Sequence, residues 1–171
     1  MPLTEKILRT FVNPVFVETG TYIGESSDLA ISVGFKEVHT IDIDPASRMI
    51  CLEKWAGMEN MHAYTGSSDV ILPRILGCIS GRITFWLDAH PWDATLDFGK
   101  APLLGELKAI RVYCDMAVSE MYPTVLIDDI RVFSKDDVAM LMELCQNLYS
   151  GCNVFRMDDD YAKGDILCVT P

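Results

Sequence analysis

Short apolar segments alternate with longer helical patterns along most of this 171-residue chain. Seven segments carry the β-branched and aromatic residues typical of strands: 15–18, 37–42, 62–65, 83–88, 124–128, 154–157 and 166–170. Five segments carry apolar residues at helical spacing: 25–33, 45–56, 69–76, 103–117 and 135–148. Alternation of this kind is typical of a parallel sheet with helices on both faces. The pattern therefore predicts an α/β fold.

The last two predicted strands depart from this alternation. Only the segment DDDYAKG lies between them, which is too short for a crossover helix. We expect these two strands to form an antiparallel hairpin at one edge of the sheet. The prediction is a single doubly wound domain over residues 1–171, with a mostly parallel seven-stranded sheet and residues 1–14 as a short N-terminal extension. Ligands of such folds bind beyond the carboxyl ends of the strands.

The composition excludes several other classes of protein. Half of the residues are hydrophobic and the mean hydropathy is +0.20, which excludes a disordered chain. No apolar run approaches the roughly 20 residues of a membrane-spanning helix, and the first residues lack the features of a signal peptide. We therefore expect a soluble, cytoplasmic protein without a membrane partner. A net charge of −11, without clustered Lys or Arg, argues against nucleic acid as a partner.

Cysteine and histidine residues are scattered singly through the sequence. The six cysteines show no pair with the spacing of a zinc or redox motif, so we expect free thiols. The three histidines, His39, His62 and His90, are equally dispersed. The sequence therefore gives little support for a Cys/His metal site.

Acidic and hydroxyl side chains stand at the ends of the predicted parallel strands. They are Glu18, Asp42, Ser67–Ser68–Asp69, Asp88 and Asp128–Asp129. Because the carboxyl ends of parallel strands share one edge of a sheet, these side chains should line one cleft. Helix capping explains some of them, but it does not easily explain an acid at the end of nearly every parallel strand.

The segment ETGTYIG, residues 18–24, joins the first predicted strand to the first predicted helix. Gly20 allows an unusual backbone angle there, and Gly24 allows the chain to approach a ligand closely. Glu18 would repel a pyrophosphate but attract an ammonium or sulfonium group. Asp42 lies about 20 residues past the turn, where a carboxylate suits the two hydroxyls of a ribose. The turn therefore suits a positively charged nucleoside, and S-adenosylmethionine is the molecule we expect.

A series of motifs resembles the class I S-adenosylmethionine-dependent methyltransferases, and in particular the metal-dependent O-methyltransferases of the catechol and macrocin type. The motifs lie between residues 15 and 133 and read ETGTYIGES, TIDIDP, YTGSSDVILPRI, FWLDAHP and TVLIDDIRVF. The resemblance implies a seven-stranded sheet whose last strand is antiparallel. It also implies transfer of a methyl group from S-adenosylmethionine to a hydroxyl of a small-molecule acceptor.

The resemblance implies a role for each matching residue. The methionine end of the cofactor would be surrounded by residues of the first turn: Glu18, Gly20, Tyr22, Gly24 and Ser26. Asp42 would bind the ribose. The adenine would lie against Ser67, Ser68 and Asp69, and Asp88 would lie at both the cofactor and the reacting groups. Packing and helix capping are the alternative roles for Tyr22 and Ser26.

The same resemblance implies a site for Mg²⁺ or another divalent cation at Asp88, Asp128 and Asp129. Neighbouring strands lie about 4.8 Å apart, so acids that end adjacent strands can reach one ion. Asp128 and Asp129 can share a site only where their strand breaks, because consecutive side chains of a strand point to opposite faces. The alternatives are that Asp129 faces solvent or that a basic residue pairs with these acids: Arg82, Lys100 or Arg131.

His90 is the candidate catalytic base, because the macrocin-type relatives resemble this chain in placing a base there and its near-neutral pKa suits proton transfer. Pro91 stands where catechol-type enzymes carry a lysine, which argues against a catechol as substrate. A structural role or a contact with adenine is the alternative for His90. The segment 90–102 is expected either to cover a substrate or to fold its aromatic residues onto the body of the protein.

Two other classes of function stay open at this point. One is a nucleotide-binding protein of the NAD type, although the turn lacks a GxGxxG motif and any phosphate-binding Lys or Arg. The other is a non-catalytic scaffold with the same fold. A homo-oligomer is also possible, because the Met- and Leu-rich segment VAMLMELCQNL could form a dimer face as readily as part of the core.

Overall fold

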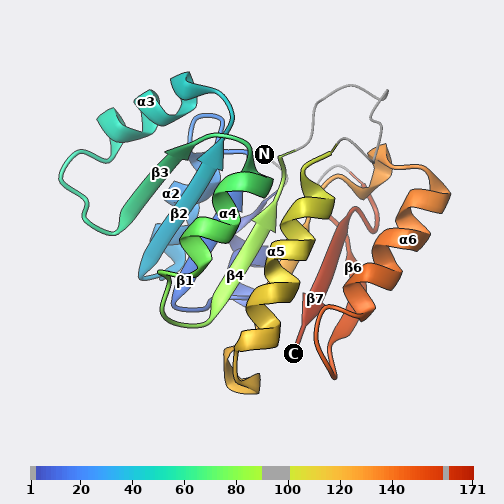
Figure 1. Cartoon of the computed structure of the whole chain (residues 1–171). Coiled ribbons are helices and arrows are strands. Elements are labelled where there is room, and N and C mark those ends of the chain that lie inside the picture. The colour runs from blue at the N-terminus through green and yellow to red at the C-terminus, as the bar shows by residue number, and fades with distance from the viewer. Residues whose placement is uncertain (1–2, 90–100, 160–161) are drawn as a thin grey trace.

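The expected strands form a seven-stranded sheet in a computed structural model, which describes residues 3–89, 101–159 and 162–171 (Figure 1). The strands are β1 (Val15–Thr19), β2 (Glu37–Asp42), β3 (Met61–Thr65), β4 (Ile83–Leu87), β5 (Thr124–Ile127), β6 (Asn153–Met157) and β7 (Ile166–Thr170). Their order in the sheet is β3-β2-β1-β4-β5-β7-β6. Strand β7 runs antiparallel to both β5 and β6, whereas the other neighbours are parallel. This arrangement confirms the predicted mostly parallel sheet with a C-terminal antiparallel hairpin.

Alternate residues of the central strands pack against helices on opposite faces of the sheet. In β1, Val15 and Val17 belong to one hydrophobic cluster and Phe16 belongs to the other. The first cluster includes residues of α4 (Ser68–Leu76), α5 (Leu103–Met116) and α6 (Lys135–Gln146). The second includes residues of α1 (Glu5–Thr10), α2 (Glu25–Val33) and α3 (Pro45–Lys54). Burial on both faces is the reason why β1 and β4 consist almost entirely of buried residues.

The parallel register brings the carboxyl ends of the first five strands to one edge of the sheet. Thr19 at the end of β1 pairs with Ile41 of β2 and with Leu87 of β4. Leu87 in turn pairs with Ile127 of β5. The acids that follow or end these strands therefore gather at one edge, which we call the carboxyl edge.

Helix α1 was not predicted, since residues 1–14 were expected to be only a short extension. Thr4 caps this helix by accepting a hydrogen bond from the Ile7 N–H, at 3.3 Å. Ile7 and Leu8 are buried against the α2 and α3 side of the sheet. Six residues are too few for a stable isolated helix, so burial of this apolar face is what stabilises α1.

Strands β4 and β5 each end one residue earlier than predicted, at Leu87 and Ile127. The next residue, Asp88 or Asp128, therefore lies just beyond its strand. The backbone then turns at Asp129, which has a φ of 55° and begins the short 3-10 helix η3 (Ile130–Val132). This break in the strand direction matters for the acidic site described below.

Candidate functional site at the carboxyl edge

The turn after β1 packs directly against the end of β4. Gly20 has a φ of 87°, and a Cβ atom on it would lie 2.4 Å from the backbone oxygen of Asp88. The Gly20 N–H also donates a 2.9 Å hydrogen bond to the oxygen of Ile41. Glycine is therefore required at position 20 both by its backbone angle and by the closeness of β4.

Gly24 is required for contact with helix α3. It has a φ of 75° and lies at the N-cap of α2. A Cβ atom there would lie 2.8 Å from Cζ2 of Trp55 and 3.0 Å from Sγ of Cys51. Packing inside the protein thus accounts for this glycine, and the expected approach to a ligand stays a prediction.

Asp42 holds the turn after β1 against the end of β2. Its Oδ2 atom accepts a 2.8 Å hydrogen bond from the backbone N–H of Tyr22, and its Oδ1 atom accepts one of 2.9 Å from that of Asp44. Tyr22 has a φ of 49°, an uncommon angle for a residue with a Cβ, and its side chain is exposed. Because a carboxylate has about four acceptor positions, the half-buried Asp42 keeps the capacity to accept further hydrogen bonds.

Glu18 is a buried acid directly under this turn. Its Oε2 atom accepts hydrogen bonds of 2.7 Å from the hydroxyls of Ser27 and Thr40. Burial raises the pKa of Glu18 to about 7. The hydroxyls of Ser27, Thr40 and Ser26 act in the opposite direction, because their hydrogen bonds favour the ionised carboxylate. Glu18 and Ser26 were predicted as site residues from the sequence, whereas Ser27 and Thr40 were not. Ser27 could have been recognised, because it lies on the buried face of an amphipathic helix.

The turn after β3 lies beside the end of β2. The Gly66 N–H donates to the oxygen of Asp42 at 2.9 Å, and the Ser67 hydroxyl donates to Oδ1 of Asp69 at 2.5 Å. Ser68 is buried at the start of α4, whereas Asp69 is exposed. The three residues expected at the adenine therefore differ in accessibility, and Ser67 and Asp69 already contact each other.

Glu106 is a buried acid near this turn that the sequence analysis missed. It lies in the first turn of α5 and is only 1% exposed. Burial raises its pKa to about 7, while the nearby hydroxyls of Ser68 and Thr19 act in the opposite direction. Its Oε1 atom makes no hydrogen bond of ordinary geometry within the part of the chain that the structure describes. The signal was available, because Glu106 interrupts the apolar stripe of its helix.

Asp88, Asp128 and Asp129 form an acidic cluster at the ends of β4 and β5. One oxygen from each carboxylate lies within 4.8 Å of the other two. Burial, followed by the charges of Asp128 and Asp129, raises the pKa of Asp88 to about 9. The pKa of Asp128 is raised to about 7, first by burial and then by the negative charge of Asp129. The left-handed backbone at Asp129 lets these consecutive side chains share one site, so the predicted clustering is confirmed.

Arg131 contacts the outer side of this cluster. Its Nη1 atom lies 2.6 Å from Oδ1 of Asp129 and 3.9 Å from Oδ2 of Asp159, and it also pairs with the carboxylate of Asp165. The Arg131 backbone N–H donates to Oδ1 of Asp165 at 2.8 Å. The expected alternative of pairing with Arg131 therefore occurs at Asp129.

The other two basic residues considered for this pairing have different outcomes. The Nε atom of Arg82 donates a 2.9 Å hydrogen bond to the backbone oxygen of Tyr122 and not to an acid of the cluster. Lys100 lies outside the described residues.

Asp159 and Asp165 come from the hairpin that closes the sheet. The antiparallel strand β7 begins at the edge where β5 ends, so the acids that precede it reach Arg131. Oxygen atoms of Asp128, Asp159 and Asp165 also lie within 4.8 Å of one another. The position of this hairpin at the sheet edge was predicted from the sequence, but the contact of its acids with the site was not.

His90, the candidate base, and the predicted covering segment up to residue 100 lie outside the described residues. All six cysteines are free, as expected, although Cys78 is exposed. No helix in the described part of the chain is long and apolar enough to cross a membrane.

Solved structures of methyltransferases share this architecture. SAH-bound methyltransferase PaMTH1 from Podospora anserina matches with a TM-score of 0.64 and 13% identity, over 96% of this chain and 74% of that one. The chain has a methyltransferase fold. An rRNA methylase from Streptococcus thermophilus matches with a TM-score of 0.57 and 12% identity, over 96% and 91% of the two chains. A Staphylococcus aureus protein named as a caffeoyl-CoA O-methyltransferase matches with a TM-score of 0.58 and 14% identity, over 96% and 79%.

The sequence itself matches no family model and no curated protein. At 12–14% identity, the structural likeness establishes the fold, which is the doubly wound fold expected from the sequence. The function therefore has to be argued from the residues at the carboxyl edge.

Proposed function

We propose that this protein is an S-adenosylmethionine-dependent methyltransferase that methylates a hydroxyl group of a small molecule with the help of a divalent cation. One observation carries the proposal. The glycine turn after β1 is tied to the acid at the end of β2 by the 2.8 Å hydrogen bond from Tyr22 to Asp42. This pair lies at the carboxyl edge, where folds of this class bind their ligands. The presence of SAH in a protein of the same fold supports the choice of cofactor.

S-Adenosylmethionine, when bound, supplies a methyl group on a positively charged sulfur. Asp42 would accept hydrogen bonds from the ribose hydroxyls through its remaining lone pairs. Gly20, Tyr22, Gly24 and Ser26 would surround the methionine end. Ser67, Ser68 and Asp69 would contact the adenine.

Glu18 would act on the cofactor mainly through its charge. Its Oε2 atom is already bonded to two hydroxyls, and its pKa of about 7 leaves it partly protonated near neutral pH. A cationic ligand close to Glu18 would favour the ionised form. Binding of a positively charged cofactor would therefore lower the pKa of this buried acid.

The acidic cluster has the donor atoms that a hard divalent cation requires. Asp88, Asp128 and Asp129 offer carboxylate oxygens, the ligands that Mg²⁺ prefers. Within the described residues, neither buried Asp128 oxygen makes a hydrogen bond of ordinary geometry. A divalent cation, when bound, lowers the pKa of a coordinated hydroxyl and makes its oxygen nucleophilic. Asp88, Asp128 and Asp129 would hold the cation beside the reacting groups, and His90 remains the predicted base.

One observation favours a version of this activity without a metal. Arg131 already neutralises part of the charge of Asp129 at 2.6 Å, so the cluster has an internal cation on one side. In that version Asp88 and Asp128 would bind the acceptor directly, with Asp88 protonated because its pKa is raised to about 9.

The net charge of −11 supports a small molecule rather than a nucleic acid as acceptor. The O-methyltransferase named above supports transfer to oxygen, whereas the rRNA methylase shows that the same fold also serves other acceptors. Transfer of a labelled methyl group from the cofactor into fractions of a cell extract would identify the class of acceptor. Labelled RNA without a labelled small molecule would contradict the proposed class.

Calorimetry with S-adenosylmethionine, SAH and NADH tests the cofactor. We expect the first two to bind and NADH not to bind. Asp42→Ala should weaken binding about 10- to 100-fold, because it removes hydrogen bonds to a charged group. Asp44→Ala is the matched control, since Asp44 lies two residues away and caps α3. No binding of either adenosyl compound to the intact protein would refute the assignment.

The cation is tested separately from the cofactor. We expect EDTA to abolish methyl transfer and Mg²⁺ to restore it. Asp128→Asn should abolish transfer while leaving cofactor affinity unchanged. Full activity in EDTA would favour the version without a metal, and cofactor binding without any transfer would favour a non-catalytic scaffold.

A further inference from the structure

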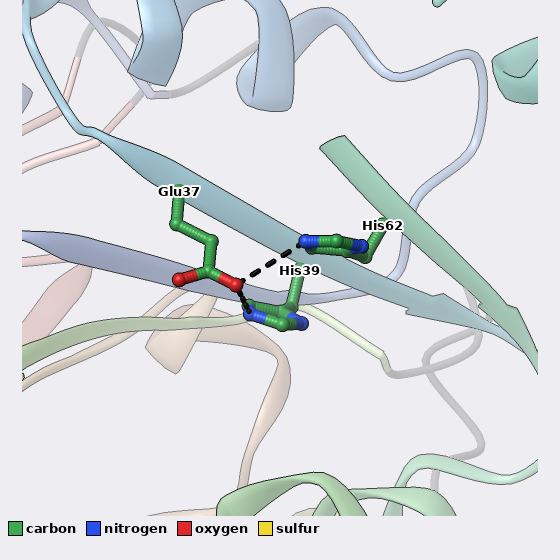
Figure 2. A group of neighbouring side chains, drawn as sticks. All are labelled: Glu37, His39 and His62. Carbon is green, nitrogen blue, oxygen red and sulfur yellow. Dashed lines mark hydrogen bonds and ion pairs between the residues drawn. The ribbon is translucent and has the colours of Figure 1, made fainter. Parts of the chain in front are cut away.

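A second group of possible metal ligands lies away from the carboxyl edge, on the outer strands β2 and β3 (Figure 2). The Oε1 atom of Glu37 is 3.1 Å from Nε2 of His39 and 3.2 Å from Nε2 of His62. The histidines are scattered in the sequence, but the fold brings these two side by side. The parallel register pairs His39 directly with His62, although they are 23 positions apart in sequence.

The register explains why the three side chains converge. Glu37 and His39 are two residues apart on β2, so they lie on the same face of the sheet. The rings of His39 and His62 stack, with centroids 4.6 Å apart and an angle of 24° between their planes. Figure 2 shows one ring nitrogen of each histidine directed toward the same oxygen of Glu37.

We propose that Glu37, His39 and His62 bind one divalent transition-metal ion, with Zn²⁺ as the preferred ion. Two imidazoles and a carboxylate are a common ligand set for zinc, whereas Mg²⁺ and Ca²⁺ prefer oxygen ligands alone. Bonds of about 2.0–2.1 Å in a tetrahedral site place the ligand atoms roughly 3.3 Å apart. The two distances to Glu37 are close to this value. The ring nitrogens lie within 4.8 Å of each other, and the stacked rings would rotate out of their stack to direct both nitrogens at one ion.

Tyr64 supports the ring of His39 from the other side. Its hydroxyl lies 3.0 Å from Nδ1 of His39, and the two rings stack with an angle of 9° between their planes. When Nδ1–H donates to the tyrosine oxygen, the lone pair of Nε2 faces Glu37. In this tautomer the lone pair of His39 Nε2 and the carboxylate of Glu37 would repel each other. A cation between them would remove this repulsion. Hydrogen bonds of this kind commonly orient metal-binding histidines.

Without an ion, His39 takes the other tautomer. Nε2–H then donates to Glu37 and the Tyr64 hydroxyl donates to Nδ1, so both ring nitrogens of His39 have a partner. The ion therefore binds by exchanging the hydrogen bond between His39 and Glu37, and the contact of His62 with Glu37, for metal–ligand bonds.

The group is accessible from solvent and has room for a fourth ligand. The side chains of His62 and Glu37 are 35% and 38% exposed. A pocket of about 310 Å³ adjoins the group and is lined by His39, Tyr64, Ile71, Arg74, Ile75 and Cys78. With three protein ligands, an open fourth position would be occupied by water or by a small ligand from this pocket.

This site would be independent of the proposed methyltransferase site. Glu37 begins β2 and Asp42 ends it, so about 16 Å of extended strand separates the two. The ion would join the edge strand β3 to β2 and stabilise that side of the sheet. Its binding can thus be tested whether or not the protein transfers methyl groups.

Titration of the whole protein with Co²⁺ and Zn²⁺ tests the site. We expect one equivalent of Co²⁺ to produce the visible absorption of a nitrogen- and oxygen-bound ion, and Zn²⁺ to displace it and raise the melting temperature. His62→Ala should lose this equivalent and the thermal shift. Glu37→Gln, which preserves size and hydrogen bonding, should weaken binding at least tenfold. Both positions are partly exposed, so these variants should fold.

Two control variants separate this site from other metal ligands of the chain. Asp128→Asn removes a ligand of the acidic cluster, and Cys78→Ser removes the exposed thiol beside the pocket. Both should keep the Co²⁺ signal. The proposal is overturned if the intact protein binds no ion, if His62→Ala binds as the intact protein does, or if only Cys78→Ser abolishes binding.

Discussion

The Nη1 atom of Arg131 lies 2.6 Å from the Oδ1 atom of Asp129, and only Ile130 lies between the two residues in sequence. The left-handed backbone at Asp129 and the 3-10 turn after it bring these side chains together. Arg131 thereby connects the acidic cluster at the ends of β4 and β5 with the acids of the C-terminal hairpin. One guanidinium group is thus in contact with carboxylates from two separate parts of the sequence.

Replacement of Arg131 should destabilise this edge of the sheet. Arg131→Met leaves the buried carboxylate of Asp165 without its charged donor, and we expect a loss of about 1–3 kcal/mol in the free energy of unfolding. Arg131→Lys is the matched control and should recover part of the loss, because it keeps the charge but not the forked geometry. Urea unfolding measures both. Equal stability of Arg131→Met and the intact protein would contradict the role of this pair.

Gly20→Ala should be more harmful than the same change at another glycine with a positive φ. Both Gly20 and Gly34 have left-handed backbones, but only at Gly20 would the new Cβ meet backbone atoms, 2.4 Å from the Asp88 oxygen. We expect about 1 kcal/mol of destabilisation for Gly34→Ala from backbone strain alone. Gly20→Ala should cost a further 1–3 kcal/mol or so and should weaken cofactor binding. Similar losses in urea unfolding would argue against the close packing of the turn on β4.

Asp128→Asn should stabilise the metal-free protein at alkaline pH while abolishing activity. The pKa of Asp128 is raised from 3.8 to about 7, so its ionisation above pH 7 is more costly in the folded than in the unfolded state. Removing that charge should increase the free energy of unfolding by on the order of 4 kcal/mol near pH 8.

The matched control for this change is Glu143→Gln, which removes an exposed acid and should have little effect. Mg²⁺ should raise the melting temperature of the intact protein and of this control, but not that of Asp128→Asn. A stabilising effect of Mg²⁺ on Asp128→Asn would place the cation elsewhere.

Glu106 should make folding stability decrease as the pH rises. Its pKa is about 7 in the folded protein and 4.5 in its ordinary state, so the folded protein binds the proton more tightly. The stability from this proton is complete below about pH 4.5 and is lost as the pH rises to 7, amounting to on the order of 3 kcal/mol. Glu106→Gln, which keeps a neutral hydrogen-bonding group, should remove this part of the slope. Urea unfolding at about pH 5 and pH 8 measures it, and an unchanged slope would show that Glu106 does not titrate in this range.

The sequence by itself predicted the type and order of nearly all elements. β-Branched and apolar runs between helical patterns carry that information locally, so β2, β7 and α2 have the predicted bounds. The short loop before β7 was enough to predict the antiparallel hairpin, since a parallel connection needs more residues. Helix α1 was missed because its stability comes from the burial of Ile7 and Leu8 and not from its own six residues.

The site was predictable only where the strand ends lie next to each other by topology. Asp88 and Asp128 follow adjacent parallel strands, so their proximity follows from the fold. The position of Glu106 depends on how α5 packs beside α4. The contact of Arg131 with Asp165 depends on the C-terminal hairpin. The stacking of His39 on His62 depends on the register of β2 and β3. Periodicity and local preference are properties of neighbouring residues in the chain, whereas these contacts arise between distant segments and are decided only when the tertiary structure forms.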